Sequence, residues 1–189
     1  MNEINFGFLV IDKPIGLTSH DCVNRLRKLY KMKRIGHGGT LDPAVTGVLP
    51  IALGKATKLL SFLPSSKKYE GTIKLGIITD TDDLEGEILK EHPLPNIDEK
   101  KIHECINSFQ GVLQQRPPRF SSVHINGERA YSKARRGEQF ELPSKEITIH
   151  KLELTEWDQE NGKIKLKIDC SAGTYIRSLA RDIGEELGC

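Results

Sequence analysis

Hydrophobic and polar residues alternate with different periods along the chain, and each period predicts one kind of element. Residues 6–13 are mostly apolar and are followed by Pro14 and Gly16, which predicts a buried strand that leads into a turn. Residues 48–53 predict a second buried strand, and residues 69–76 alternate as a half-buried strand does. The N-terminal part of the chain is therefore expected to contain at least three strands.

A β-hairpin is predicted near the C-terminal end of the sequence. Residues 146–156 and Lys163–Cys170 have strand character and flank Asn161-Gly162, a residue pair that favours a tight turn. In the second strand apolar residues alternate with charged ones, so we expect one face to lie on the core. The residues expected on that face are Ile164, Leu166, Ile168 and Cys170.

A helix is predicted after the first turn. Thr18 and Asp21 have the spacing of a capping box, in which each residue bonds the backbone of the other at a helix N-terminus. Apolar residues then recur at helical spacing, with basic residues opposite them. We expect the buried face to contain Val23, Leu26, Leu29 and Tyr30.

Three further helices are predicted. Residues 55–62 form a short one, and Asp98 begins another that Gly111 ends. The last helix follows Gly173 and places Arg177 and Arg181 on a face separate from its apolar residues. Those apolar residues are Ile176, Leu179, Ala180, Ile183 and Leu187.

Two segments are predicted to be irregular. Residues 36–47 contain four glycines and a proline, which favours a loop. Residues 114–143 have little periodicity and form a long excursion with a small helix at residues 130–136. Strands and helices mix without strict alternation, so the sequence predicts an α+β fold around a mainly antiparallel sheet rather than a doubly wound parallel one.

Composition places the chain among soluble globular proteins. Its 189 residues are 37% hydrophobic and 29% charged, which allows a substantial core and excludes general disorder. No apolar run approaches the roughly 20 residues of a membrane helix, and the N-terminal residues lack the pattern of a signal peptide. We expect a cytoplasmic protein without membrane association. The four cysteines form no CxxC pair and are expected to be reduced and mostly buried.

Charge is unevenly distributed although the net charge is only +2. Residues 25–34 carry six basic and no acidic residues, and residues 116–136 carry six basic residues and Glu128. Residues 79–104, in contrast, carry nine acidic and three basic residues. Basic tracts with interspersed aromatic residues suit a nucleic-acid backbone, but solvated helix and loop surfaces have the same composition. Charge alone leaves both interpretations open.

Common nucleotide and metal motifs do not fit this sequence. Gly54-Lys55 lacks the earlier glycine and the following Ser or Thr of a phosphate-binding loop. The acidic run from Asp80 to Glu85 has a leucine at a ligand position of a calcium loop, so we interpret it as a solvated hairpin. The histidines show none of the spacings of a hydrolytic zinc site. We expect no metal site.

Asp42 is the only acid of the glycine-rich loop and precedes Pro43. A carboxylate in such a loop is accessible to a ligand because neighbouring side chains are small. An Asp-Pro pair also simply begins a turn in many proteins. The loop by itself supports either a functional or a structural role for Asp42.

Several segments in order resemble the bacterial tRNA pseudouridine synthase B (TruB) family. The most specific are GGTLDP at residues 38–43 and GTYIRSLA at residues 173–180. The others are KPIGLTS at residues 13–19, KY at residues 68–69 ahead of LGIITDTDDLEG, and RPPRFSSVHINGERAYSKARRG at residues 116–137. Together they cover nearly the whole chain, so the resemblance implies a pseudouridine synthase fold with a thumb-like insertion.

The resemblance implies a reaction on RNA. A TruB enzyme isomerises the uridine at position fifty-five of tRNA, in the TΨC loop of the T-arm, by base flipping and without a cofactor or metal. It breaks the N-glycosidic bond and rejoins the ribose to carbon 5 of the same base. By the family pattern Asp42 is the catalytic carboxylate. Attack on the ribose and attack on the pyrimidine ring both remain open.

The resemblance also assigns roles to individual residues. Arg177 matches the arginine that pairs with the catalytic carboxylate, and Tyr69 matches the tyrosine that stacks on the flipped uracil and is placed to take the proton from carbon 5. His37 matches the histidine that occupies the gap left by the flipped base, and we expect Arg181 and Asp182 to be structural. The remaining residues expected to contact RNA are Gly38, Gly39, Thr40, Arg116, Arg119, Arg129, Lys133, Arg135 and Arg136.

In the family the catalytic domain continues past Gly188-Cys189 with a further strand and is followed by a small RNA-binding domain. We therefore expect residues 1–189 to be a catalytic domain truncated at its C-terminal end, with residues 114–145 as an RNA-clamping insertion and without the PUA-like domain. The expected state is a monomer without a protein partner. A catalytically incomplete module that binds the T-arm is the alternative function.

Overall fold

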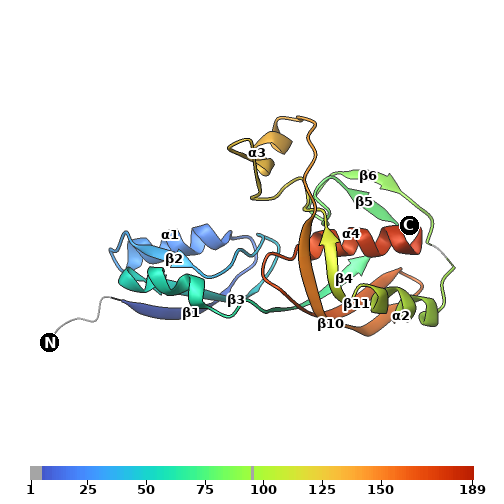
Figure 1. The fold of residues 1–189 in the computed structure, drawn as a ribbon, viewed down its shortest axis with the longest axis horizontal. Helices are drawn as coiled ribbons and strands as arrows, with labels where there is room; N and C mark the ends of the chain where they lie inside the picture. Colours follow the sequence, from blue (N-terminus) through green and yellow to red (C-terminus); the bar gives the residue numbers. More distant parts are fainter. Residues whose placement is uncertain (1–5, 95) are drawn as a thin grey trace. The chain divides into compact units, whose positions relative to one another are not determined.

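Two structural units divide the chain in the computed structural model, which describes residues 6–94 and 96–189. The first unit extends to Pro64 and the second begins at Ser65. Each has its own sheet and its own apolar cluster (Figure 1). No helix in the described residues is long and apolar enough to cross a membrane.

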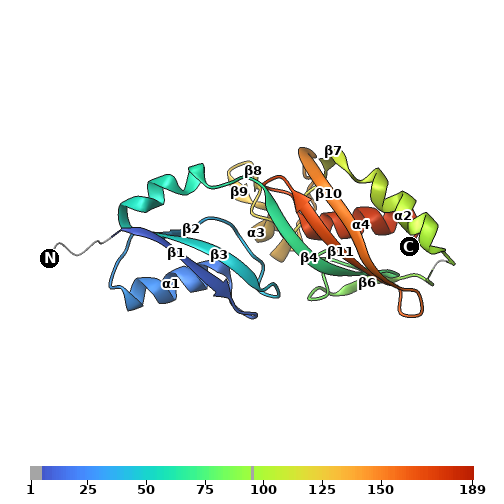
Figure 2. The same ribbon diagram turned by 90° about the horizontal axis from the view of Figure 1, so that it is seen from below.

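The first unit is built on a three-stranded antiparallel sheet in the order β1-β3-β2. Its strands are β1 (Gly7–Lys13), β2 (Ile35–His37) and β3 (Gly47–Leu53). Helix α1 (Ser19–Leu29) covers one face, where Val23 packs with Leu49 and Ile51. The 3₁₀ helix η1 (Gly54–Phe62) covers part of the other face, as Figure 2 shows. Gly36 makes room for it, because a Cβ there would lie 3.1 Å from Leu60 Cδ1.

The predicted capping box is present at the start of α1. The Thr18 hydroxyl accepts a hydrogen bond from the Asp21 backbone at 3.0 Å, and the Asp21 carboxylate accepts one from the Thr18 backbone at 3.0 Å. The prediction that Leu29 and Tyr30 belong to the buried face is wrong, because Leu29 is 73% and Tyr30 47% exposed. The helix ends at Leu29, so these two residues lie at its last turn, beyond the sheet-facing contacts of Val23 and Leu26.

Two other expectations for the first unit need correction. The strand at residues 6–13 is present but is not fully buried, since Phe8 and Val10 are 45% and 64% exposed. Alternate side chains point to opposite faces of a strand, and only one face of β1 lies on the core. The loop predicted at residues 36–47 begins later than expected. Gly36 and His37 pair with Ala52 and Ile51, so both belong to β2.

The second unit contains a four-stranded antiparallel sheet in the order β4-β11-β10-β7. Its strands are β4 (Lys67–Lys74), β7 (Gly111–Gln115), β10 (Lys145–Asp158) and β11 (Lys163–Cys170). Helices α2 (Glu99–Ser108) and α4 (Ile176–Leu187) pack on one face (Figure 2). The predicted alternation of β11 is confirmed, because its apolar residues are all buried against those helices.

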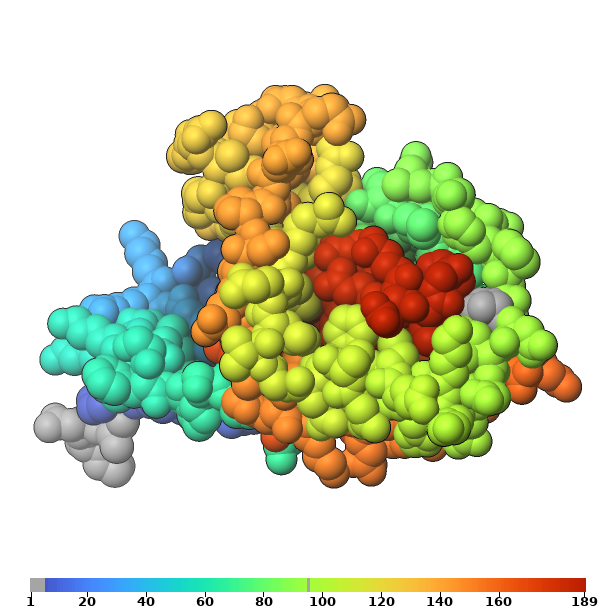
Figure 3. Space-filling model, turned by 45° about the vertical axis from the view of Figure 1, so that its right-hand side comes forward, coloured from blue at the N-terminus to red at the C-terminus, as the bar shows by residue number. Residues whose placement is uncertain are grey.

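Smaller elements surround this sheet. Strands β5 (Ile77–Thr79) and β6 (Ile88–Glu91) form a hairpin across the acidic loop. Between β7 and β10 the chain makes the predicted excursion, which contains β8 (His124–Ile125), β9 (Glu128–Arg129) and α3 (Ala130–Arg135). The excursion projects from the rest of the second unit (Figures 1 and 3).

Every strand pairing in the described residues is antiparallel, and helices and strands mix without regular alternation. The predicted α+β class is therefore confirmed. The cysteines are also as expected: all four are free thiols, of which Cys22, Cys105 and Cys170 are buried and Cys189 is partly buried.

Candidate active site

The loop that carries Asp42 connects β2 to β3 in the first unit and is held by Lys13. Lys13 is the last residue of β1 and is completely buried. Its Nζ donates hydrogen bonds to the carbonyl oxygens of Leu17 at 2.6 Å, Pro14 at 2.9 Å and Pro43 at 3.4 Å. One amino group thus ties the turn after β1 to the residue that follows Asp42.

Two further contacts hold the residues on either side of Asp42. The Ser19 hydroxyl accepts a hydrogen bond from the Leu41 backbone N–H at 2.8 Å and lies 3.3 Å from the Leu41 carbonyl. The Gly16 N–H donates to the Pro43 carbonyl at 2.8 Å. Gly16 has a φ of +82°, a conformation that glycine adopts without strain. The chain is therefore anchored at both neighbours of Asp42, so a fixed backbone presents the Asp42 side chain.

Lys13 and Ser19 are functional candidates for which residue-by-residue reasoning from the sequence provides no role. Both belong to the KPIGLTS segment. A lysine at the end of an apolar strand suggests a surface residue, because lysine is almost never fully buried unless it is paired. In the sequence, the one indication of a role for Lys13 is its place in a segment that resembles the family. In the structure, its burial is the indication, because burying an amino group with three donors is costly unless each donor is paired.

Lys13→Met is expected to lower both stability and activity. Methionine keeps the unbranched apolar stem but removes the donor to the Leu17, Pro14 and Pro43 carbonyls, of which Pro43 keeps its bond from the Gly16 N–H; each buried acceptor left unpaired costs about 1–3 kcal/mol. A shift of the Asp42 loop by about 1 Å is enough to reduce turnover roughly 100-fold. Thermal melting and single-turnover uridine isomerisation measure the two effects, with the exposed Lys28→Met as the matched control. Parental behaviour in both assays would show that Lys13 does not position the loop.

His37 is the last residue of β2, and Gly38, Gly39 and Thr40 form the first part of the loop that follows it. The Gly38 N–H donates to the Pro50 carbonyl at 2.8 Å, and a Cβ on Gly38 would lie 2.5 Å from Leu63 Cδ1. A larger residue at position 38 would therefore require the Leu63 side chain to move. His37 is half-buried, and its Nδ1 has no hydrogen-bond partner among the described residues. Burial lowers the pKa of His37, while a hydrogen bond to the Gly39 backbone opposes this shift.

The lowered pKa of His37 predicts a contribution to acid instability. The unfolded chain binds a proton at the ordinary pKa of about 6.5, whereas the folded chain does so only at lower pH. His37 therefore stabilises the fold above pH of about 6.5, and this contribution is lost as the pH falls below that value. We expect His37→Gln to reduce the loss of thermal stability between about pH 7.5 and 5.5. An unchanged profile, equal to that of the exposed control His150→Gln, would contradict this assignment.

Tyr69 lies in the second unit, on strand β4. Its backbone pairs with Ile168 of β11, and its partly buried ring packs against the apolar cluster between the sheet and the helices. The strand pairing fixes the position of the backbone, so the ring is presented from a rigid element rather than from a loop. A rigid aromatic surface of this kind is suited to stacking against a planar ligand.

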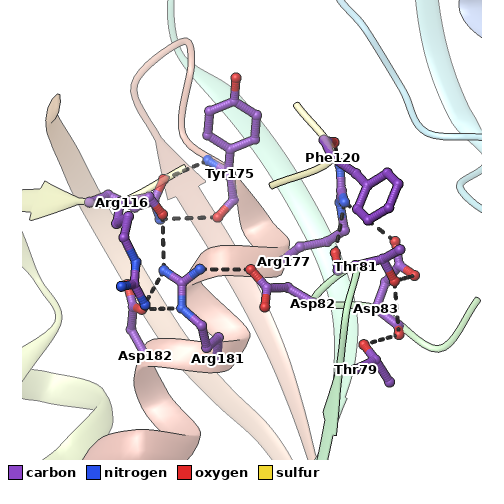
Figure 4. A network of polar contacts seen from close by, with 11 residues as sticks. Thr79, Thr81, Asp82, Asp83, Arg116, Phe120, Tyr175, Arg177, Arg181 and Asp182 are labelled. Carbon is purple, nitrogen blue, oxygen red and sulfur yellow. Dashed lines mark hydrogen bonds and ion pairs between the residues drawn. The ribbon is translucent and has the colours of Figure 1, made fainter. Parts of the chain in front are cut away.

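Arg177 lies in the first turn of α4 and crosslinks two other segments of the second unit (Figure 4). Its Nη1 donates to the Thr81 carbonyl at 2.8 Å and lies 3.6 Å from the Asp83 carboxylate. Its Nη2 donates to the Phe120 carbonyl at 3.2 Å. The guanidinium is thereby held between the β5–β6 loop and the start of the excursion.

The backbone just before Arg177 is held by Gln115, which sequence reasoning does not identify. Gln115 is buried at the end of β7, and its side-chain amide donates to the Tyr175 carbonyl at 3.0 Å. Its side-chain oxygen accepts from the Tyr175 N–H at 2.8 Å. This two-point contact fixes the N-terminal end of α4, and with it the base of the Arg177 side chain. A glutamine in a strand has no local pattern that predicts such a contact.

Arg181 lies one helical turn after Arg177 and joins the acidic loop to α4. It donates to the Asp82 carboxylate at 2.7 Å, to Asp182 at 2.7 Å and to the Arg116 carbonyl at 2.9 Å (Figure 4). Burial raises the pKa values of Asp82 and Asp182, while Arg181 opposes both shifts. The interpretation of residues 80–85 as a solvated hairpin is therefore wrong for Asp82 and Asp83, because both carboxylates contact arginines of α4.

The basic residues of the excursion do not all have the same surroundings. Glu138 accepts hydrogen bonds from Lys133 at 2.9 Å and Arg136 at 2.7 Å, and its carbonyl accepts one from Arg119 at 2.7 Å. Arg136 also binds both carboxylate oxygens of Glu128, and these contacts raise the pKa of Arg136. The other basic residues of the excursion are Arg116, Arg129 and Arg135, and all three are exposed. The Arg135 guanidinium lies over the Tyr131 ring.

Within residues 6–94 and 96–189, no three His, Cys, Asp or Glu side chains are grouped as metal ligands would be. The chemistry available to the described groups is that of a carboxylate, a phenol, a guanidinium and an imidazole. Such groups bind, transfer protons and act as nucleophiles.

Comparison with known proteins identifies relatives along the whole chain. The family described as TruB family pseudouridylate synthase (N terminal domain) matches residues 27–176. A tRNA pseudouridine synthase B of Prochlorococcus marinus (strain SARG) is 69% identical over 189 residues, which are 100% of this chain and 60% of that protein. The protein of the same name from Parasynechococcus marenigrum (strain WH8102) is 60% identical, over 97% of this chain and 63% of its own. The chain thus spans about three fifths of the length of these curated relatives.

Solved structures with the same fold are also similar in sequence. A crystal structure of a Cbf5-Nop10-Gar1 complex contains a chain that is 32% identical, with a TM-score of 0.73 over 98% of this chain and 45% of that one. A structure of an H/ACA RNP bound to a substrate RNA containing 2'-deoxyuridine gives 30% identity and a TM-score of 0.69, over 98% of this chain and 44% of that one. The chain therefore shares its fold with the matched chains of these two complexes.

Proposed function

Because the chain belongs to the TruB family of pseudouridylate synthases, we propose that it isomerises the T-loop uridine of tRNA to pseudouridine. The observation that carries this proposal is the family match over residues 27–176, which includes the Asp42 loop. The arrangement of that loop supports it, since buried contacts on both sides of Asp42 fix the backbone from which the carboxylate would act.

The proposed reaction needs no co-reactant. The bond between uracil N1 and ribose C1′ breaks, the base turns over, and a new bond forms between C5 and C1′. The proton on C5 is lost and N1 gains one, so the product is an isomer of the substrate. Asp42 is the proposed nucleophile, toward either the ribose or the ring, and its covalent or tightly held intermediate retains the base while it turns.

The other site residues have distinct proposed roles. Tyr69 stacks on the flipped uracil and accepts the C5 proton, Arg177 counters the carboxylate charge, and His37 fills the gap that the flipped base leaves. The rigid placement of Tyr69 on β4 and of Arg177 at the start of α4 supports these assignments, because catalytic groups act best from fixed backbones. The neutral form of His37, favoured by its lowered pKa, suits a group that enters an uncharged base stack.

Residues 114–145 are the proposed RNA clamp, and the chain as a whole is the proposed catalytic domain. The excursion projects from the rest of the second unit (Figure 3). It carries exposed basic side chains, which are suited to phosphate contacts. Ion pairs to Glu128 and Glu138 give the clamp a defined shape. We propose that the chain acts on the T-arm as a cytoplasmic monomer.

Release of tritium from a T-arm hairpin labelled at uridine carbon 5 tests this function directly. We expect one tritium released per hairpin that contains the T-loop uridine, and none from a hairpin with cytidine at that position. Hairpin binding without tritium release would overturn the catalytic proposal and leave an RNA-binding module. Absence of both activities would remove RNA as the substrate.

A further inference from the structure

The first unit carries a strong positive charge that the proposed site does not use. From residue 22 to residue 64 the sequence contains eight basic residues and one acidic residue, Asp42. Six of the basic residues form the tract at residues 25–34, and the other two are Lys55 and Lys58 in η1. None belongs to the excursion at residues 114–145.

Three of these basic residues, Arg25, Arg27 and Lys28, belong to α1. Arg27 donates to the Asn24 side chain at 3.1 Å and to the Ile35 carbonyl at 3.2 Å, so it joins α1 to the start of β2. Arg25 and Lys28 are exposed on α1 itself, and Lys28 lies in the last helical turn, where the helix dipole favours a basic residue. The remaining basic residues lie beyond the helix, where that explanation does not apply.

Two contacts of Arg34 join the end of the basic tract to η1. The Arg34 Nε donates to the Thr57 hydroxyl at 2.7 Å, and the Arg34 carbonyl accepts from the Gly54 N–H at 2.8 Å. Lys55 follows Gly54 and Lys58 follows Thr57, so both lysines are linked to the segment that precedes β2. We call this group the basic rim. It consists of the exposed residues Lys31, Lys33, Arg34, Lys55 and Lys58.

The basic rim has no internal counter-charge. No side chain of the rim lies within ion-pairing distance of a carboxylate in the described residues. In the excursion, by contrast, Glu128 and Glu138 neutralise part of the basic charge. Five exposed cations without a neighbouring carboxylate repel one another, and a polyanion that binds across them relieves this repulsion while releasing its own counterions.

We propose that the basic rim is a second RNA-binding surface, which contacts the sugar–phosphate backbone of tRNA outside the groups that act on the uridine. This inference rests on the proposed function. The lysine ammonium is a flexible point charge, whereas the arginine guanidinium is planar and binds two acceptors at once. Four lysines and one arginine therefore suit contacts to phosphates, which position the RNA and do not depend on its sequence. The rim therefore contributes to affinity and its salt dependence, and leaves the choice of uridine to the active site.

The test compares two variants that lose the same charge. The rim variant is Lys33→Gln, Lys55→Gln and Lys58→Gln, which leaves the Arg34 contacts intact. The control variant is Lys90→Gln, Lys100→Gln and Lys101→Gln, three exposed lysines of the acidic segment. The dissociation constant for tRNA is measured from about 50 to 200 mM salt for the parent and for both variants, and circular dichroism and melting check that all three are folded.

We expect the rim variant to bind tRNA about tenfold more weakly at the lowest salt, with a salt slope smaller by about two units, since each lost phosphate contact removes about 0.7–0.9. The control should match the parent. The isomerisation rate at saturating tRNA should be unchanged in both variants, because the rim does not touch the reacting uridine.

Three results would overturn the inference. If the parent isomerises tRNA and the rim and control variants have the same slope, the rim does not bind RNA although the proposed function stands. If the rim variant loses binding to anionic phospholipid vesicles while its tRNA binding is unchanged, the rim is a membrane surface. If the parent neither binds nor isomerises tRNA, the proposed function fails together with the rim.

Discussion

Asp42→Asn is expected to abolish tritium release while hairpin affinity stays within about tenfold of the parent value. Asparagine has nearly the same shape as aspartate, so the loop that Lys13 and Ser19 hold should keep its conformation. The amide has no nucleophilic oxygen anion, and loss of the proposed nucleophile typically lowers turnover by about 10⁴-fold or more. Phosphate contacts supply most of the affinity for RNA and are not affected by the change.

The matched control for this experiment is Asp12→Asn, which removes an exposed carboxylate from the same unit. It should release tritium at the parental rate. Equal melting temperatures of the two variants would show that any loss in Asp42→Asn arises from chemistry rather than from unfolding. Turnover at the parental rate by Asp42→Asn would exclude this carboxylate from the mechanism and undermine the proposed function.

Tyr69→Phe is expected to stop tritium release without weakening binding. Phenylalanine keeps the ring that packs against the apolar cluster and stacks on the uracil, so base flipping should survive. The change removes the hydroxyl that is proposed to accept the C5 proton. A tyrosine phenol ordinarily titrates near pH 10, so proton transfer to it requires a site that favours the phenolate or a concerted step.

A second variant separates the ring from the hydroxyl. Tyr69→Leu removes the stacking surface and is expected to weaken hairpin binding by an amount equivalent to about 1–3 kcal/mol. Tyr30→Phe, at an exposed position at the end of α1, is the control for loss of a phenol and should behave as the parent does. If Tyr69→Phe releases tritium at the parental rate, another group or a water molecule takes the proton and Tyr69 serves only as a stacking surface.

Much of the fold can be predicted from the sequence because its signals are local. The capping box of Thr18 and Asp21, the alternation along β11 and the helical spacing in α4 each involve residues a few positions apart, and each is confirmed. Asp42 was identifiable for a related reason: it is the one acid of a glycine-rich loop and lies within a segment specific to a family.

The errors arise where burial depends on distant parts of the chain. Val10 and Leu29 are apolar and regularly spaced, but both are exposed. Among the described residues of the first unit, α1 lies on one face of the small sheet and η1 covers part of the other. Periodicity predicts that a segment has two faces. It does not predict whether another element is available to cover a given residue on them.

Only the tertiary structure reveals the groups that hold the site in place. Lys13 reaches the Pro43 carbonyl across 30 residues, Gln115 reaches Tyr175 across 60, and Arg181 reaches Asp82 across 99. None of these pairs leaves a periodic or short-range pattern, because a side chain and its partner are brought together by strand pairing and helix packing elsewhere. The sequence by itself therefore determined the elements and the candidate chemical group. The folded chain decided which buried polar residues satisfy one another, since an unpaired donor or acceptor in the interior is costly and each must find its partner in three dimensions.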